Sequence, residues 1–254
     1  MGASATGAAT YDGWTLDRLA AALGVPRLAL FADVESTMDV AHALAAEGAP
    51  AGTLVIADAQ RAGRGRGRRR WVASSGAGLW CTLIERPNEA LALDVLSLRV
   101  GLRAAAALDR FAGDTVGLKW PNDLYLHGRK VGGILVESRW RDGRPDWAAI
   151  GIGVNIVPPP EIPSASALGT RATRVGILAE LVPAVRAAAR ARGHLSEAEL
   201  AGFAQRDVAA GRVCVAPRAG RVAGIAADGA LLVVCADGVQ RCRGGSLVFE
   251  GDPP

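Results

Sequence analysis

The residues best suited to bind an anion lie in one short segment, residues 61–71. It contains six arginines and three glycines and ends at Trp71. The whole chain has a formal net charge of +4, so without these arginines it would be slightly acidic. Arginine presents planar, charged donors that match carboxylate and phosphate oxygens, and successive glycine N–H groups can form an anion-binding concavity. The segment, called the arginine loop below, therefore predicts a site for a carboxylate or a phosphate.

Other interpretations of the arginine loop stay open on this segment alone. It could be an arm that binds nucleic acid, or a solvated run of charge. It lacks the Gly-Lys-Ser/Thr ending of a Walker A loop and the helix-start fingerprint of a dinucleotide site. Trp71 suits stacking on a planar group, but it would fit a hydrophobic core equally well.

Three further clusters place polar groups beside expected strands. In residues 119–123 (Lys-Trp-Pro-Asn-Asp) the proline fixes the backbone before a carboxamide and a carboxylate, although an ordinary turn would look the same. Lys130 precedes Gly132-Gly133, and residues 151–155 (Gly-Ile-Gly-Val-Asn) end in Asn155. Glycines weaken a strand, so their presence indicates that a ligand approaches the backbone.

The histidines and cysteines form no convincing catalytic constellation. The three histidines are scattered, and none belongs to a Ser-His-Asp or Cys-His pattern. The four cysteines form no Cys-x-x-Cys pair, and no nearby histidine completes a zinc pattern. We expect them to be small hydrophobic residues in a reducing cytoplasm, with Cys81 and Cys214 in apolar strands.

Strand and helix signals alternate over residues 28–206, which predicts a mixed α/β domain. Pro183 predicts a kink or a late start in the helix that contains it. Helices are expected at 39–47, 91–111, 175–192 and 196–205, the last capped by Ser196 with Glu199. Strands are expected at 28–32, 53–57, 79–84, 116–119, 124–126, 131–138 and 147–156.

The two ends of the chain differ from this central part. Residues 1–27 are expected to be a flexible segment without a signal peptide, and no apolar run is long enough to span a membrane. From residue 207 the pattern changes to short strands, with hairpin signals at Asp228-Gly229 and Asp237-Gly238. Strands at 213–216, 220–226, 230–235 and 239–243 predict a small β-barrel over residues 207–254.

Four motifs together resemble those of the biotin protein ligases, in that family's order. They are Gly63-Arg64-Gly65-Arg66 through Trp71, residues 119–123, Gly132 to Glu137, and residues 151–155. The C-terminal strand pattern is similar to the family's small SH3-like domain. The resemblance implies a mixed α/β (α+β) catalytic domain of the class II aminoacyl-tRNA-synthetase type at residues 28–206, with an SH3-like β-barrel after it.

The resemblance implies a two-step ligase. Biotin's carboxylate attacks the α-phosphorus of ATP, giving biotinyl-5′-AMP and pyrophosphate, and a lysine of a biotin carboxyl carrier protein then displaces AMP. Neither step needs an enzyme nucleophile, so catalysis rests on positioning and on stabilising charge. The implied substrates are biotin and ATP with Mg²⁺. The implied setting is the cytoplasm, without nucleic acid or membrane; the oligomeric state, including a homodimer, stays open.

The resemblance also implies roles for single residues. Those implied for biotin are Ser36, Thr37, Gln60, Arg64, Gly65, Arg66, Lys130 and Gly133. Those implied for ATP are Arg66, Arg69, Trp71, Asn122, Asp123, Lys130 and Asn155. The catalytic residues implied are Lys130, Arg66 and Asp123. The resemblance implies no direct protein cage for a metal; the Mg²⁺ would come with ATP and lie near Asp123. Asp123 is also a candidate to accept the proton of the incoming lysine.

Two departures from the family pattern stand out. Met38 replaces the usual Asn of a Ser-Thr-Asn sequence, so that contact with biotin is lost or replaced by packing. The 27 residues before Leu28 are too few for a winged helix-turn-helix, so we expect a ligase without a DNA-binding domain. We also expect the arginine loop to be mobile in the empty enzyme and to close over the adenylate.

Two alternatives remain. A lipoate ligase or octanoyl transferase resembles the same catalytic fold, although the Gly-Arg-Gly-Arg and Lys-Trp-Pro-Asn-Asp motifs favour biotin. A nucleic-acid-binding protein would use the arginine loop, but it gives no reason for the other three motifs. Pyrophosphate exchange that depends on biotin or on lipoate separates a biotin ligase from a lipoate ligase. Duplex binding that weakens with salt tests the nucleic-acid-binding alternative.

Overall fold

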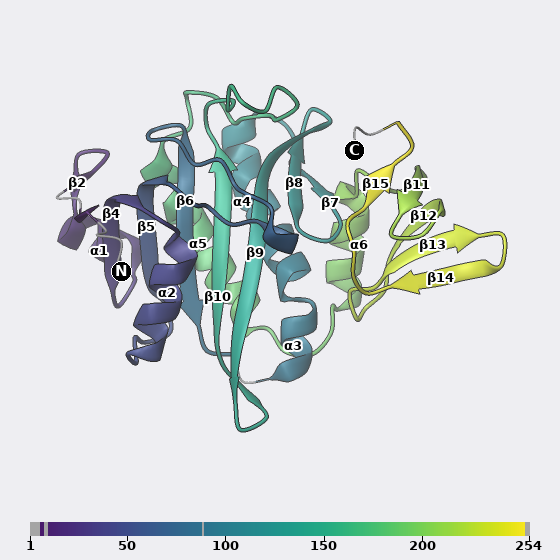
Figure 1. Cartoon of the computed structure of the whole chain (residues 1–254), viewed down its shortest axis with the longest axis horizontal. Helices are drawn as coiled ribbons and strands as arrows, with labels where there is room; N and C mark the ends of the chain where they lie inside the picture. The colour runs from purple at the N-terminus through teal and green to yellow at the C-terminus, as the bar shows by residue number, and fades with distance from the viewer. Residues whose placement is uncertain (1–5, 8–9, 88, 252–254) are drawn as a thin grey trace.

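A central mixed sheet organises the chain, whose computed structural model describes residues 6–7, 10–87 and 89–251. Its eight strands run in the order β1-β4-β5-β6-β10-β9-β8-β7 (Figure 1). The β4–β5 pair is parallel, and the other neighbours are antiparallel. The strands are β1 (Thr6–Gly7), β4 (Leu28–Val34), β5 (Thr53–Gln60), β6 (Gly78–Glu85), β7 (Gly117–Lys119), β8 (Asp123–Leu126), β9 (Arg129–Arg141) and β10 (Arg144–Asn155). The predicted mixed α/β fold with a mixed sheet is confirmed.

Helices cover both faces of this sheet. They are α1 (Leu16–Leu23), α2 (Thr37–Ala46), the short η1 (Arg66–Arg68), α3 (Ala90–Asp94), α4 (Leu96–Ala112), α5 (Arg174–Arg190) and α6 (Glu197–Arg206). Helix α2 packs on β5, β6 and β10 from one side, whereas α4 and α5 lie together on the other (Figure 1). Alternation along β5 serves both layers, because Leu54 and Ile56 enter the larger core and Val55 packs beneath α2.

A second, five-stranded antiparallel sheet lies beside the edge strand β7. Its order is β14-β13-β12-β11-β15. Its strands are β11 (Val213–Ala216), β12 (Gly220–Ile225), β13 (Leu231–Cys235), β14 (Gly238–Cys242) and β15 (Val248–Phe249). The Trp120 indole N–H donates to the Gly229 carbonyl at 2.9 Å, and Lys119 Nζ lies 4.5 Å from the Phe249 ring centroid. These contacts fix the second sheet next to the end of β7.

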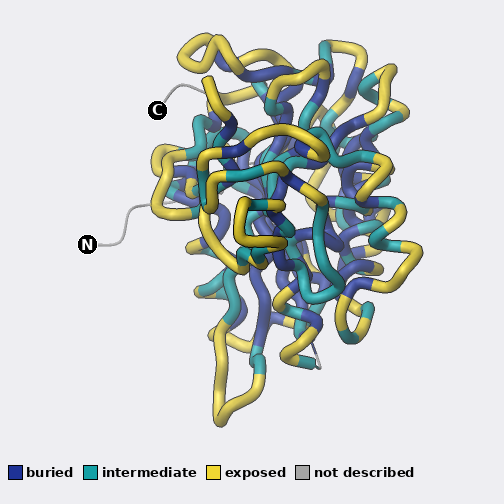
Figure 2. The backbone as a smooth tube through the Cα atoms, turned by 90° about the vertical axis from the view of Figure 1, so that its right-hand side faces the viewer, coloured by how far each residue is buried: buried dark blue, intermediate teal, exposed yellow. Residues whose placement is uncertain are grey.

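The expected elements of the central region are present, with boundaries that shift by a few residues. The β9–β10 hairpin is longer than expected, and its exposed tip extends beyond the body of the molecule (bottom of Figures 1 and 2). The predicted cap of α6 is confirmed: Glu199 N–H donates to Ser196 Oγ at 3.2 Å and Ser196 N–H donates to Glu199 Oε2 at 2.9 Å. Cys81 and Cys214 are buried as predicted. Burial raises the pKa of the Cys81 thiol to about 12.

A flexible segment was expected over residues 1–27. This expectation is wrong for residues 10–23, which are most of the residues that the structure describes there. Residues 10–23 form β2 (Thr10–Tyr11), β3 (Trp14–Thr15) and α1. Tyr11 is 2% exposed, and Arg174 Nε donates to both carboxylate oxygens of Asp12 at 3.0 and 3.1 Å. This ion pair between distant residues stabilises β2 and β3, which are too short to show a pattern in the sequence. Residues 1–5 and 8–9 lie outside the described part.

One helix prediction needs correction, and of the two effects offered for Pro183 the late start is not observed. The single helix expected at 91–111 is interrupted at Val95, whose φ of −109° and ψ of 1° are not helical, so α3 and α4 are separate. Helix α5 starts at Arg174, before Pro183 by more than two turns, so the proline does not delay its start. Within the described residues, none of the helices combines the length and apolar character needed to cross a bilayer.

Candidate active site

The four motif segments meet at one cavity of about 590 Å³ on the face of the sheet that carries α2. All residues to which the sequence assigned a role line it. They are Ser36, Thr37, Gln60, Arg64, Gly65, Arg66, Arg69, Trp71, Asn122, Asp123, Lys130, Gly133 and Asn155. The structure thus brings these side chains together, while their individual roles stay predictions.

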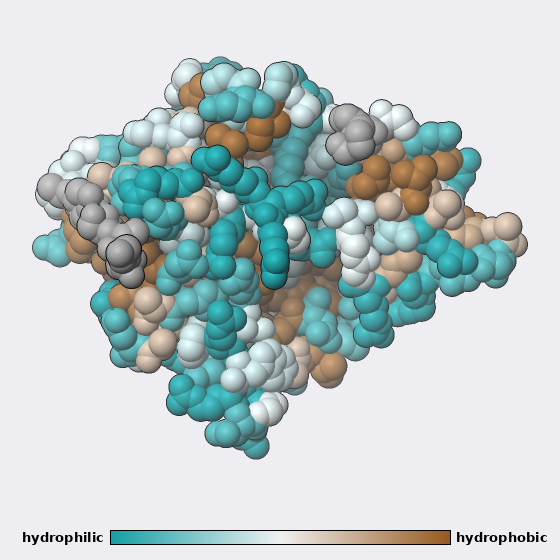
Figure 3. Space-filling model, in the orientation of Figure 1, coloured by the Kyte–Doolittle hydropathy of each residue, from teal (hydrophilic) through white to brown (hydrophobic). Residues whose placement is uncertain are grey.

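The arginine loop crosses this face in front of β9 and β10 (Figure 1). Hydrophilic side chains dominate the same place on the surface, with hydrophobic residues visible below them (Figure 3). The loop folds back on itself, since Gly65 N–H donates to Arg69 O at 2.7 Å and Trp71 N–H donates to Gly63 O at 2.8 Å. A Cβ at Gly63 would lie 2.5 Å from Trp71 O, so this turn requires a glycine.

The Trp71 indole rests on the glycine motifs of β9 and β10. A Cβ at Gly153 would lie 2.5 Å from indole Cε2, and one at Gly133 would lie 3.3 Å from Cζ3. Trp80 packs edge-on against it, with ring centroids 6.1 Å apart. The indole N–H is buried without a hydrogen-bond partner among the described residues. The glycines therefore make room for Trp71, and stacking of this ring on adenine stays a prediction.

Arg66 and Arg69 reach across the cavity to the connection between β14 and β15. The Arg66 guanidinium donates to the Gly245 carbonyl, and Arg69 Nη2 donates to Ser246 Oγ at 3.0 Å. Arg66 Nε is buried and has no hydrogen-bond partner among the described residues. Burial, together with the like charge of Arg69, lowers the pKa of Arg66. A bound anion would satisfy that donor and relieve the repulsion between the two guanidinium groups.

Lys130 and Asp123 form an ion pair at the other wall, with Nζ 2.6 Å from Oδ1. The neighbouring Asn122 is fixed to β9, because its Nδ2 donates to Ile134 O at 2.7 Å. Among the described residues no group of three or more His, Cys, Asp and Glu side chains could hold a metal.

Asn155 is almost fully buried at the end of β10. Its Nδ2 donates to Ser166 O at 3.0 Å, and Ser166 N–H donates to Lys130 O at 2.7 Å. The carboxamide therefore ties the segment after β10 to the end of β10, and the Ser166 N–H ties the same segment to the strand that carries Lys130. This positioning contact is added to the nucleotide contact predicted for Asn155.

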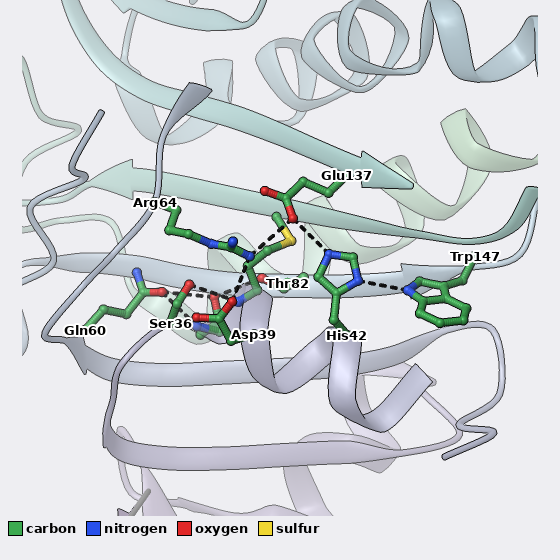
Figure 4. A network of polar contacts seen from close by, with 10 residues as sticks. Ser36, Asp39, His42, Gln60, Arg64, Thr82, Glu137 and Trp147 are labelled. Carbon is green, nitrogen blue, oxygen red and sulfur yellow. Dashed lines mark hydrogen bonds and ion pairs between the residues drawn. The ribbon is translucent and has the colours of Figure 1, made fainter. Parts of the chain in front are cut away.

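A small polar cluster of Ser36, Thr37, Gln60 and Thr82 lies near the start of α2. Figure 4 labels Ser36, Gln60 and Thr82 of this cluster. Gln60 Oε1 accepts from Thr37 N–H at 2.9 Å and from Thr37 Oγ1 at 3.1 Å. Thr82 Oγ1 donates to Thr37 Oγ1 at 2.9 Å, and Ser36 Oγ caps α2 by accepting from Met38 N–H at 3.3 Å. Such hydroxyl and amide groups can both donate to and accept from a neutral polar ligand.

Several cavity residues escaped the sequence analysis. Thr82 carried a signal, since it is a polar residue inside an apolar strand. Met38, by contrast, was singled out in the sequence: it is 3% exposed, and a Cβ at Gly151 would lie 2.8 Å from its Cε, so packing occupies this position. The C-terminal contributors had no recognisable motif of their own. They are Arg212, Ser246, Leu247, Val248 and Phe249.

Comparison with known proteins identifies the family. Residues 30–155 match the Biotin/lipoate A/B protein ligase family. The chain belongs to this family. Among curated relatives, the bifunctional ligase/repressor BirA of Bacillus spizizenii is 41% identical over 124 residues, which are 48% of this chain and 38% of that protein. The biotin--[acetyl-CoA-carboxylase] ligase of Paracoccus denitrificans is 41% identical over 46% of this chain and 49% of its own length.

Solved structures extend the likeness to most of the chain. Biotin protein ligase from Aquifex aeolicus in complex with biotin and ATP has a TM-score of 0.73 at 24% identity, covering 89% of this chain and 99% of that one. The enzyme from Leishmania major in complex with biotinyl-5-AMP has a TM-score of 0.62 at 26% identity, covering 85% and 98%. The matched region is about half or less of the length of the curated relatives above. The fold is thus shared with these solved ligases well beyond the four motif segments.

Proposed function

We propose that the protein is an ATP-dependent biotin ligase that forms biotinyl-5′-AMP and transfers biotin to a lysine of a biotin carboxyl carrier protein. The observation that carries this proposal is one cavity with two chemically different parts. The polar cluster suits the ureido group of biotin, which both donates and accepts hydrogen bonds. The arginine loop and Lys130 suit a carboxylate and a phosphate.

In the first step a carboxylate oxygen of biotin attacks the α-phosphorus of ATP. The bond from that phosphorus to the bridging oxygen breaks, and pyrophosphate leaves with the electron pair. Two anions must approach each other, which costs free energy unless positive charge lies close to both. Arg64, Arg66 and Lys130 supply that charge from two sides of the cavity, where fixed donors need no reorganisation.

In the second step the carrier lysine attacks the acyl carbon of the adenylate. The bond from that carbon to the phosphate oxygen breaks, AMP leaves, and the amine loses a proton as the amide forms. Among the described residues that line the cavity, Asp123 is the carboxylate, so we assign proton acceptance to it. Its ion pair with Lys130 would hold it in place until the amine arrives.

The remaining assignments follow from the same proposal. Residues 28–206 would form the biotin- and ATP-binding domain of the class II synthetase type, and residues 207–254 an SH3-like barrel. We further propose a cytoplasmic enzyme that acts without nucleic acid. Binding of a duplex finds little support, because Arg64, Arg66 and Arg69 line the cavity and each contacts other groups of the protein.

Exchange of labelled pyrophosphate into ATP tests this proposal. We expect exchange that depends on biotin, followed by addition of one biotinyl group to a carboxylase carrier domain, read by mass. Exchange with lipoate or octanoate but not with biotin would assign the protein to the lipoate branch. Duplex binding that weakens steeply with salt, without adenylate formation, would favour the nucleic-acid alternative.

A further inference from the structure

A continuous chain of polar contacts links Arg64 of the arginine loop, through Glu137 and His42, to Trp147 on β10 (Figure 4). Arg64 Nη2 lies 3.2 Å from Glu137 Oε2, and the same oxygen lies 2.9 Å from His42 Nε2. On the other side of the imidazole, Trp147 Nε1 donates to His42 Nδ1 at 2.9 Å. Arg64 also pairs with Asp39 Oδ1 at 2.9 Å. Four segments, the loop, β9, α2 and β10, thus meet in one network.

The direction of the hydrogen bonds in this network is fixed by chemistry. An indole N–H can only donate, so His42 Nδ1 must be the unprotonated, accepting nitrogen. The ring proton is then on Nε2 and is donated to Glu137. Burial lowers the pKa of His42, and the nearby cations Arg139 and Arg64 lower it further, whereas Glu137 opposes them. His42 is therefore held neutral, in one tautomer.

We infer that Trp147 and His42 are positioning residues that fix Glu137 so that it holds Arg64 at the cavity. This inference rests on the proposed function, in which Arg64 meets the carboxylate of the acid. The exposed fractions of Arg64 and Asp39 are 37% and 56%, and ion pairs between exposed groups contribute little alone. His42 is 11% exposed, and its second hydrogen bond immobilises the carboxylate before Arg64 pairs with it.

Removal of the indole N–H would have two consequences. The imidazole could rotate, so Glu137 would lose its fixed orientation. Nδ1 would also be free to take up a proton, and a cationic His42 would compete with Arg64 for the same carboxylate oxygen. The facing groups are Glu137 and Arg139 on β9, Arg64 on the loop and Asp39 on α2. We therefore expect Arg64, and with it the arginine loop, to be released as the pH falls.

Limited proteolysis of the ligand-free protein tests this inference, because trypsin cleaves after arginine. Trp147→Phe is compared with Trp140→Phe, a matched control on the same hairpin whose 51% exposed indole donates only to Ser138 Oγ. We expect the loop to be cleaved about three- to tenfold faster in Trp147→Phe than in Trp140→Phe, because this ratio corresponds to the net stabilisation by roughly one hydrogen bond. The ratio to the control should grow from pH 7.5 to pH 6.

Two variants of His42 keep the test decisive if Trp147→Phe folds poorly. His42→Gln can donate to Glu137 and accept from Trp147 but cannot titrate, so we expect cleavage close to that of the wild type at every pH. His42→Leu should cleave as fast as Trp147→Phe. In active protein, the KM for biotin should rise in parallel while the KM for ATP stays unchanged.

The outcomes separate this inference from the proposed function. Cleavage in Trp147→Phe and His42→Leu equal to that in Trp140→Phe, with no pH dependence of the ratio, would overturn the positioning role even if the enzyme ligates biotin normally. Faster cleavage in a protein that forms no biotinyl adenylate would leave the positioning role standing and remove the proposed function. A nitrogen NMR spectrum with Nδ1 protonated in the wild type would also contradict the inference.

Discussion

The indole of Trp71 occupies the space that a side chain at Gly153 would need. A Cβ built at Gly153 would lie 2.5 Å from Trp71 Cε2 and 2.7 Å from Nε1. A glycine in a central strand has no side chain to pack against its neighbours. At Gly153 this loss of packing is offset by the close approach of the Trp71 ring from the arginine loop. The glycine motif of residues 151–155 therefore makes room for the motif that ends at Trp71, although 82 positions separate Gly153 from Trp71.

Gly153→Ala should displace Trp71 and weaken nucleotide binding. Overpacking of this kind costs roughly 1–3 kcal/mol, so we expect the KM for ATP to rise about tenfold or more. Pyrophosphate exchange at varied ATP concentration measures this. Gly202→Ala is the matched control, because its Cβ would lie 3.4 Å from Leu102, an ordinary contact far from the motifs. Equal KM values for the two variants would refute a role of this contact in nucleotide binding.

Arg66→Ala should shorten the lifetime of the enzyme-bound adenylate. The variant loses a guanidinium whose buried Nε has no hydrogen-bond partner in the part of the chain that the structure describes. A hydrogen bond to a charged group contributes about 1.5–3 kcal/mol. We expect release about ten- to a hundredfold faster, measured by dilution of preformed adenylate and filtration. Arg68→Ala removes an exposed arginine of the same loop that does not line the cavity, and it should release adenylate at the wild-type rate.

The site could be predicted from the sequence because each motif is local: its residues lie within a few positions of each other at the end of a strand. Partners that the topology brings together could not be predicted in this way. Trp147 and His42 are 105 residues apart, and Ser246 and Arg69 are 177 apart. Nothing in either neighbourhood marks such a pair, since the register of β9 and β10 decides which side chains face α2.

The prediction for the N-terminal segment, residues 1–27, was wrong for a related reason. Strands of two residues, such as β2 and β3, are too short to show alternation, and they are stable only through distant contacts. Arg174 supplies these by pairing with Asp12 and by lying 4.2 Å from the Tyr11 ring centroid. The division at Val95 was similarly invisible, because residues 90–112 have helix-forming composition throughout.

Lys130→Ala should slow formation of the adenylate more than it weakens binding of either substrate. Its ammonium, 2.6 Å from Asp123, is placed to stabilise charge that develops as carboxylate and phosphate combine. Loss of one such fixed donor slows the chemical step about 100-fold or more. Rapid-quench measurement of a single turnover should show the slower step, with KM values changed much less. A normal rate of adenylate formation would remove Lys130 from the chemistry.

The neutral state of His42 should make stability depend on pH in a direction that the structure fixes. Burial lowers the pKa of His42 from its usual value of 6.5, so below that pH the unfolded chain binds a proton that the folded protein excludes. The contribution of His42 to the free energy of unfolding is then complete above about pH 6.5 and declines as the pH falls toward the folded-state pKa. Urea unfolding of the wild type and of His42→Gln at pH 7.5 and pH 5.5 measures it, since other groups, such as Glu85 and Asp207 with their raised pKa values, cancel in the difference. We expect the stability of the wild type relative to His42→Gln to fall at the lower pH. A relative stability that is constant or rises on acidification would show that His42 carries a proton on both nitrogens in the folded protein.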